Sequence, residues 1–118
     1  MVSAQIVSVG GKAISPDDKM LILFNEKATH DLKEVSLIQK FNDDVNEINL
    51  NSSSKIKINS EVYDIKYLGK LVNDNLKQIG HVTLAFKAKP QNPLESTIYL
   101  GNVVFPKVKV GDFIEYIN

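Results

Sequence analysis

The sequence predicts a mostly β fold, either a barrel or a sandwich, with roughly seven to nine short strands and one short helix. Three observations lead to this prediction. Apolar and polar residues alternate with period two along most of the chain, turn-forming residues interrupt the alternation, and only one segment has helical spacing. The length of 118 residues suits one hydrophobic core, so we expect a single domain over residues 1–118.

The first half of the chain contains three predicted strands. Val2–Val9 alternates until Val7, where the apolar phase slips by one residue, as it does at a β-bulge. Met20–Phe24 is apolar on both faces, which favours a strand covered on both sides. Glu34–Phe41 is the third strand, and the Asn and Asp residues after it are typical of a turn.

The second half contains a predicted hairpin and three later strands. Lys55–Ile58 and Glu61–Leu68 flank an Asn-Ser turn and should therefore pair with each other. The later strands, which are bounded by glycine or proline, are expected over His81–Lys87, Thr97–Phe105 and Asp112–Ile117.

The one predicted helix covers approximately residues 73–79. Asn73 is a suitable N-cap, because its side chain can accept a hydrogen bond from a free backbone N–H of the first turn. Leu76 and Ile79 share one face at a spacing of three residues. Gly80 suits the left-handed conformation that commonly ends a helix.

Composition favours a cytoplasmic protein that binds neither membrane nor nucleic acid. No apolar run approaches the roughly 20 residues that span a bilayer, and the first residues lack the features of a secretory signal. Fourteen basic and fourteen acidic side chains are spread along the chain, whereas a nucleic-acid site concentrates positive charge. Lys107 and Lys109 form the strongest basic cluster, and two lysines on a strand edge make a weak patch.

Several kinds of chemical site have no support in the sequence. The chain has no cysteine, no glycine-rich nucleotide-binding motif and no pair of histidines at the spacing of zinc ligands. No GxSxG motif supports a serine nucleophile, although a triad assembled in space leaves no local pattern. The catalytic candidates therefore narrow to the two histidines, His30 and His81.

His81 begins a predicted strand, where strand alternation places it on the same face as Thr83. Val82, Leu84 and Phe86 occupy the other face and should meet the core, so His81 and Thr83 are expected to point outward. A neutral imidazole is a nucleophile that can accept a phosphoryl group, and the Thr83 hydroxyl could donate a hydrogen bond to that group.

A purely structural role is the alternative for both histidines. A polar residue just after a helix, such as His81, can simply hydrogen-bond the last free carbonyls. His30 lies in the polar segment KATHDLKE and is expected to face water.

The stretch DNLKQIGHVTLAF resembles the glucitol/sorbitol-specific IIA component of the bacterial phosphotransferase system. KMLILFNE and DLKEVSLI before it, and GDFIEYI after it, agree in order, so the resemblance covers nearly the whole chain. Its most specific part is the NL–IGHVTL–F core. The resemblance implies a small closed β-barrel, located in the cytoplasm, without metal or organic cofactor.

The resemblance also implies a function. Such proteins accept a phosphoryl group from HPr on a histidine and pass it to the cysteine of a IIB domain. That cysteine delivers it to a sugar entering through the membrane IIC component. The family pattern has its usual phosphorylated histidine after the DL-x-E segment, at the position of Gln39 in this chain. Glutamine cannot form phosphohistidine, which leaves His81 as the histidine that matches a family motif.

Two other functions stay open at this point. Gln39 favours a IIA-like binding or regulatory module that has lost phosphoryl transfer. A small barrel could instead bind single-stranded nucleic acid through stacking aromatics, for which Tyr63, Tyr67 and Tyr99 are candidates.

Overall fold

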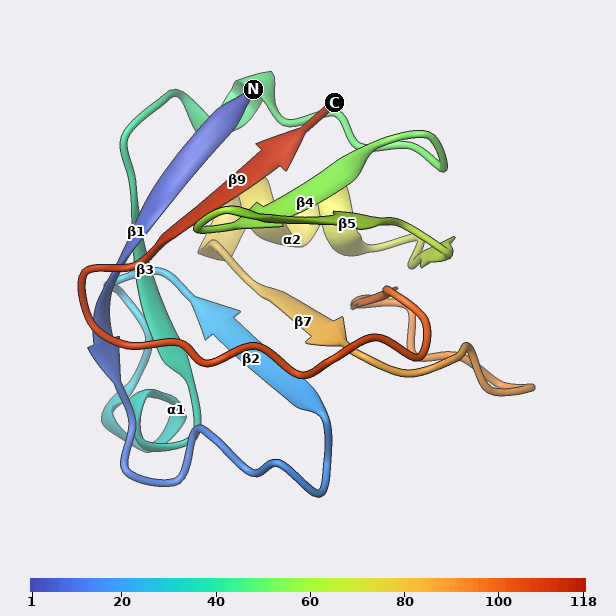
Figure 1. Cartoon of the computed structure of the whole chain (residues 1–118). Helices are drawn as coiled ribbons and strands as arrows, with labels where there is room; N and C mark the ends of the chain where they lie inside the picture. Colours follow the sequence, from blue (N-terminus) through green and yellow to red (C-terminus); the bar gives the residue numbers. More distant parts are fainter.

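Nine strands form one continuous sheet in the computed structural model, which describes all 118 residues (Figure 1). In chain order the strands are β1 (Val2–Val9), β2 (Met20–Phe24), β3 (Leu37–Phe41), β4 (Lys55–Ile58), β5 (Glu61–Asp64), β6 (Tyr67–Leu68), β7 (Val82–Ala85), β8 (Thr97–Tyr99) and β9 (Phe113–Ile117). The helices are α1 (His30–Glu34), the 3₁₀ turn η1 (Val45–Glu47) and α2 (Val72–Ile79). Neither α-helix is long and apolar enough to cross a membrane.

The sheet has the strand order β5-β4-β9-β1-β3-β2-β7-β8-β6 and curls into a half-barrel (Figure 1). This confirms the expected mostly β class and strand number. The curl stops short of a closed barrel, because no ladder joins the terminal strands β5 and β6. The β2–β3 and β7–β8 pairs are parallel, and the other pairs are antiparallel. Strand β9, the last along the chain, lies between β4 and β1.

Strand β1 shows how the sequence alternation produces the core. Val2, Ala4 and Ile6 are fully buried, and the residues between them are more exposed. The pairing of β1 with β3 shifts register between Ile6 and Ser8, which confirms the predicted bulge. The bulge leaves Val7 without a partner on β3, at the residue where the apolar phase changes.

The structure corrects the predicted third strand. Residues His30–Glu34 form helix α1, so β3 begins only at Leu37. Thr29 caps this helix by accepting a hydrogen bond from the Leu32 N–H at 3.4 Å, and Asp31 lies in its first turn. A capping hydroxyl followed by an acidic residue is a helix-start signal.

Two further predicted strands are shorter than expected. Glu61–Leu68 is divided into β5, which pairs with β4, and β6, which pairs with β8. Strand β8 ends at Tyr99 and not at Phe105, because Gly101 adopts a left-handed conformation with φ of 82°. The chain after this turn leaves the sheet.

Helix α2 occupies the predicted position with different terminal contacts. It begins after Leu71, which makes no side-chain capping bond, so the predicted capping role of Asn73 is wrong. Instead the Asn73 amide accepts from the Leu50 N–H at 2.8 Å and donates to the Leu50 carbonyl at 2.9 Å. Val72 and Leu76 form the buried face, because they are four residues apart, whereas Ile79 is exposed.

Candidate functional site

The junction between α2 and β7 positions His81. Gly80 ends the helix in the predicted left-handed conformation, with φ of 60° and ψ of 28°. The Gly80 N–H donates to the Leu76 carbonyl and the His81 N–H donates to the Asn75 carbonyl. These two carbonyls are therefore satisfied by the backbone, and the imidazole of His81 contacts the Leu23 carbonyl of β2 and not the end of the helix.

The imidazole ring of His81 is held in one orientation by two contacts with strand β2. Its Nδ1 lies 2.9 Å from the Leu23 carbonyl oxygen, and the ring stacks on Phe24 with centroids 4.2 Å apart and an interplanar angle of 16°. A carbonyl oxygen only accepts, so Nδ1 carries the proton and donates it. The neutral ring then has its free lone pair on Nε2, which is the nucleophilic nitrogen. His81 is only partly buried.

Thr83 lies two residues after His81 on the same face of β7, but that face is not open as expected. Thr83 is only 9% exposed, and every residue of β7 is buried. Its neighbours across the sheet are Ile22 of β2 and Thr97 of β8. The expectation of an open outer face fails because β7 is an inner strand and is covered on both faces. His81 was predicted to begin this strand, but it lies just before β7 and is only partly buried.

Gln39 lies in the protein interior and connects two elements of the site. Its side chain is fully buried, with Nε2 donating to the Gly80 carbonyl at 2.9 Å. Its Oε1 accepts from the Tyr116 hydroxyl at 2.7 Å. A chain of hydrogen bonds therefore runs from β9 through Gln39 to the peptide that precedes His81. Gln39 is inaccessible to a partner protein in this structure.

No hydrogen bond or ring stacking joins His30, Tyr67 or Tyr99 to His81. His30 begins helix α1 and is exposed, as expected. Tyr99 is 2% exposed, and the Lys89 ammonium lies over the Tyr67 ring at 5.0 Å from its centroid, so neither tyrosine presents a free stacking face. No group of three or more histidine and acidic side chains could hold a metal ion.

We expect Gly80→Ala to lower the free energy of unfolding by about 2–4 kcal/mol, from left-handed strain and overpacking together. A Cβ atom at Gly80 would lie 2.6 Å from the Asn25 Cβ atom and 2.9 Å from the Asn25 backbone nitrogen. Gly11→Ala is the control, because a Cβ there meets nothing within 4 Å. Urea denaturation of both variants measures the difference, and equal stabilities would contradict the strained junction.

Stability at alkaline pH should depend on Tyr116. Burial raises the pKa of the Tyr116 hydroxyl well above its usual range, and the bond to Gln39 opposes this only in part. The folded protein therefore holds the proton more tightly than the unfolded chain does. Stability should fall as pH rises above about 10, by at most about 1.4 kcal/mol per pH unit for this group. Tyr116→Phe should flatten this slope in urea titrations, and an unchanged slope would contradict the assignment.

Sequence reasoning singled out His81 as a candidate but missed the residues that hold its ring in place. The Leu23 carbonyl and the Phe24 ring come from β2, and nothing in the sequence shows that β2 lies beside β7. Gln39 did carry a signal in the sequence, because it is a polar residue that directly follows the apolar pair Leu37 and Ile38. The structure buries all three side chains, and a buried polar side chain needs hydrogen-bond partners.

Comparison with known proteins places the chain in a family. Residues 1–115 match the family model described as PTS system glucitol/sorbitol-specific IIA component. The glucitol/sorbitol-specific EIIA components of Escherichia coli K12 and Shigella flexneri are 27% and 26% identical over 112 residues. Each match covers 94% of this chain and 89% of the relative.

A solved structure agrees with the computed one. The crystal structure of the PTS system IIA component from Enterococcus faecalis V583 superimposes with a TM-score of 0.92 and is 33% identical in sequence. The match covers 98% of this chain and 99% of that chain. The fold, the family match and the relatives agree, and this protein belongs to the glucitol/sorbitol-specific IIA components of the phosphotransferase system.

Proposed function

We propose that the protein is a phosphocarrier that accepts a phosphoryl group from HPr on His81 and passes it to the cysteine of a IIB domain. The sugar would enter through a IIC component of a glucitol/sorbitol-type permease, and the carrier would act in the cytoplasm. The observation that carries the proposal is the hydrogen bond from His81 Nδ1 to the Leu23 carbonyl, because it leaves the Nε2 lone pair available.

In the proposed first step, Nε2 of His81 attacks the phosphorus atom of phospho-HPr. A new N–P bond forms as the N–P bond of the donor histidine breaks, and the donor nitrogen recovers its electron pair. The His81 ring keeps the proton on Nδ1 and becomes cationic. The Leu23 carbonyl and the C-terminal end of α2 both favour this positive charge, whereas the same helix end disfavours the negative charge of the phosphoryl group.

In the second step the thiolate of the IIB cysteine attacks the same phosphorus atom. The S–P bond forms, the N–P bond breaks, and the ring returns to its neutral form. Thr83 stays a candidate donor to the phosphoryl oxygens, because it shares the strand face of His81, although it is only 9% exposed. Positioning and such donors account for most of the catalysis in phosphoryl transfer.

The wild-type protein tests this proposal directly. It is incubated with phosphoenolpyruvate, enzyme I and HPr, and its intact mass is measured before and after mild acid treatment. One acid-labile phosphoryl group is expected. Absence of any group, while another IIA carrier in the same mixture is labelled, would overturn the proposal.

The second candidate is a IIA-like binding or regulatory module without phosphoryl transfer. It is favoured by Gln39, which stands at the family's usual histidine position and is fully buried in a hydrogen-bonded role. This candidate predicts stable binding to a IIB domain with no phosphoryl group on either histidine. The same labelling experiment separates it from the first.

A further inference from the structure

A pocket of about 180 Å³ lies beside the His81 site, between the end of helix α2 and the start of helix α1. Its apolar lining residues are Phe24 of β2, Ala28 in the β2–α1 loop, Leu32 of α1 and Ile79 of α2. Phe24 belongs to both places, because its ring also stacks on the imidazole of His81 with centroids 4.2 Å apart. A single aromatic ring therefore links the pocket to the candidate phosphoryl acceptor.

The walls of the pocket are held in place by hydrogen bonds within the chain. The Asn25 Oδ1 accepts from the Lys27 N–H at 3.0 Å, and the Thr29 hydroxyl accepts from the Leu32 N–H at 3.4 Å. The Asn25 N–H donates to the Ile79 carbonyl at 3.1 Å, which connects the loop wall to the helix wall. The pocket is thus preformed, and two of its polar side chains are already engaged.

Two large apolar side chains of the pocket are open to solvent. Leu32 is 37% exposed and Ile79 is 46% exposed, and they come from different helices. Helix α1 buries none of its side chains, so packing within the chain does not account for a leucine at this place. A cavity of about 150 Å³ can hold one benzene molecule. The pocket therefore has room for one large apolar side chain of another protein.

A protein that reacts with His81 has to lie over this region. Even a weak, transient interface buries about 600 Å² on each partner, which corresponds to a patch roughly 14 Å in radius. A partner centred on the imidazole thus reaches Phe24 and the pocket that Phe24 lines. Because the imidazole is neutral before transfer, it offers no ionic attraction, and affinity has to come from the surrounding surface.

We propose that this pocket is part of the docking surface for HPr and receives one apolar side chain of that protein. The inference rests on the function proposed above, in which HPr is the phosphoryl donor. Lys27 favours a phosphorylated partner, because it lines the pocket and takes part in none of the three ion pairs of the chain. Its positive charge is complementary to the phosphoryl group that HPr brings.

The first test is a titration of the isotopically labelled full chain with unphosphorylated HPr, followed by NMR. The amide signals of Phe24, Ala28, Leu32 and Ile79 should shift as HPr is added. Ile79→Asp and Leu32→Asp should each weaken binding tenfold or more, because each places a charge in an apolar contact. Both side chains are exposed in the free protein, so both variants are expected to fold.

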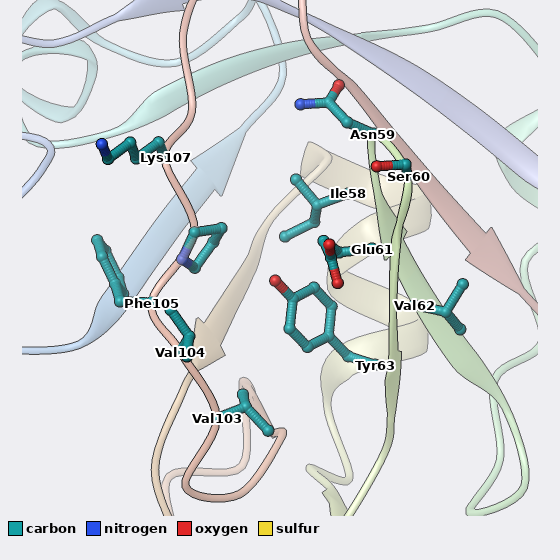
Figure 2. A pocket seen from close by; sticks show the side chains of 11 residues that line it. Ile58, Asn59, Ser60, Glu61, Val62, Tyr63, Val103, Val104, Phe105 and Lys107 are labelled. Atoms are coloured by element: carbon teal, nitrogen blue, oxygen red, sulfur yellow. The ribbon is translucent and has the colours of Figure 1, made fainter.

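Val104→Asp is the matched control, because Val104 is 86% exposed and the same change there introduces the same charge. Val104 lines a separate groove between β5 and the segment Val103–Lys107 (Figure 2), which shares no residue with the pocket beside His81. This variant should bind HPr as the wild type does. Ile79→Leu, which keeps the apolar contact, should also retain binding.

The rate of transfer from phospho-HPr gives a second readout, measured at increasing concentrations of this protein. Ile79→Asp should raise KM tenfold or more and change kcat less than twofold, because the pocket contacts HPr and not the reacting atoms. Lys27→Glu should raise KM several-fold, and this effect should shrink as salt is added.

Three results would overturn the proposal: no binding of HPr, shifts that stay outside the pocket, or full binding by both aspartate variants. Pocket shifts caused by a IIB domain and not by HPr would overturn it too, as would shifts that grow with the concentration of the protein alone. The titration involves no phosphoryl group, so it tests the docking surface even where labelling of His81 fails. Labelled wild type with an untouched pocket would remove only this inference.

Discussion

Replacing His81 by alanine is expected to abolish phosphoryl acceptance from HPr, reducing it to the level of a mixture without HPr. His81 is the histidine whose Nδ1 proton is committed to a backbone carbonyl, so its Nε2 lone pair is available in the neutral ring. Loss of the hydrogen bond and the stacking on Phe24 should cost about 1–2 kcal/mol of stability, so the variant is expected to remain folded.

His30→Ala is the matched control, because His30 is the only other histidine and is exposed at the start of α1. It should be labelled as the wild type is. Labelling of His81→Ala would show that His81 is not the acceptor. The attachment atom gives a second check, since NMR of the labelled protein should find the phosphoryl group on Nε2 and the proton on Nδ1.

Replacing Gln39 by leucine is expected to lower the free energy of unfolding by about 2–5 kcal/mol. The change leaves the Gly80 carbonyl and the Tyr116 hydroxyl without partners in a site from which water is excluded. Each unsatisfied buried group costs about 1–3 kcal/mol. Gln91→Leu is the control, because Gln91 is exposed and the same change there should be nearly neutral.

A double-mutant cycle of Gln39→Leu with Tyr116→Phe tests the connection between the two residues. Removing both ends of a hydrogen bond costs less than the two single changes together, so we expect a coupling of at least about 1 kcal/mol. Additive single effects would show that the bond contributes little. The His81 ring gives an independent readout, because release of the Gly80 carbonyl should alter the NMR signals of its nitrogens.

The strand content was predictable because burial on one face imposes a period of two. Val2, Ala4 and Ile6 show this in β1, and the slip at Val7 coincided with a bulge. Helix α1 was missed because its five residues include no buried side chain, so no apolar periodicity marks it. Its Thr29 cap was the available signal.

The candidate site was predictable only in part. Alternation correctly placed His81 and Thr83 on one face, but it does not report whether other segments cover that face. The stacking of His81 on Phe24 joins residues that are 57 positions apart in the sequence. The hydrogen bond from Gln39 to Gly80 joins residues that are 41 positions apart. Such contacts depend on which strands become neighbours, and this is a property of the whole sheet.

Strand β9 has a consequence for the order in which the protein can form during synthesis. Strand β4 reaches the rest of the sheet only through β9, which lies between it and β1. The β4–β5 hairpin therefore has no neighbouring strand until residue 117 has left the ribosome. The nascent chain must keep β1 unpaired on that side until β9 emerges, so the sheet is completed by the strand that is synthesised last.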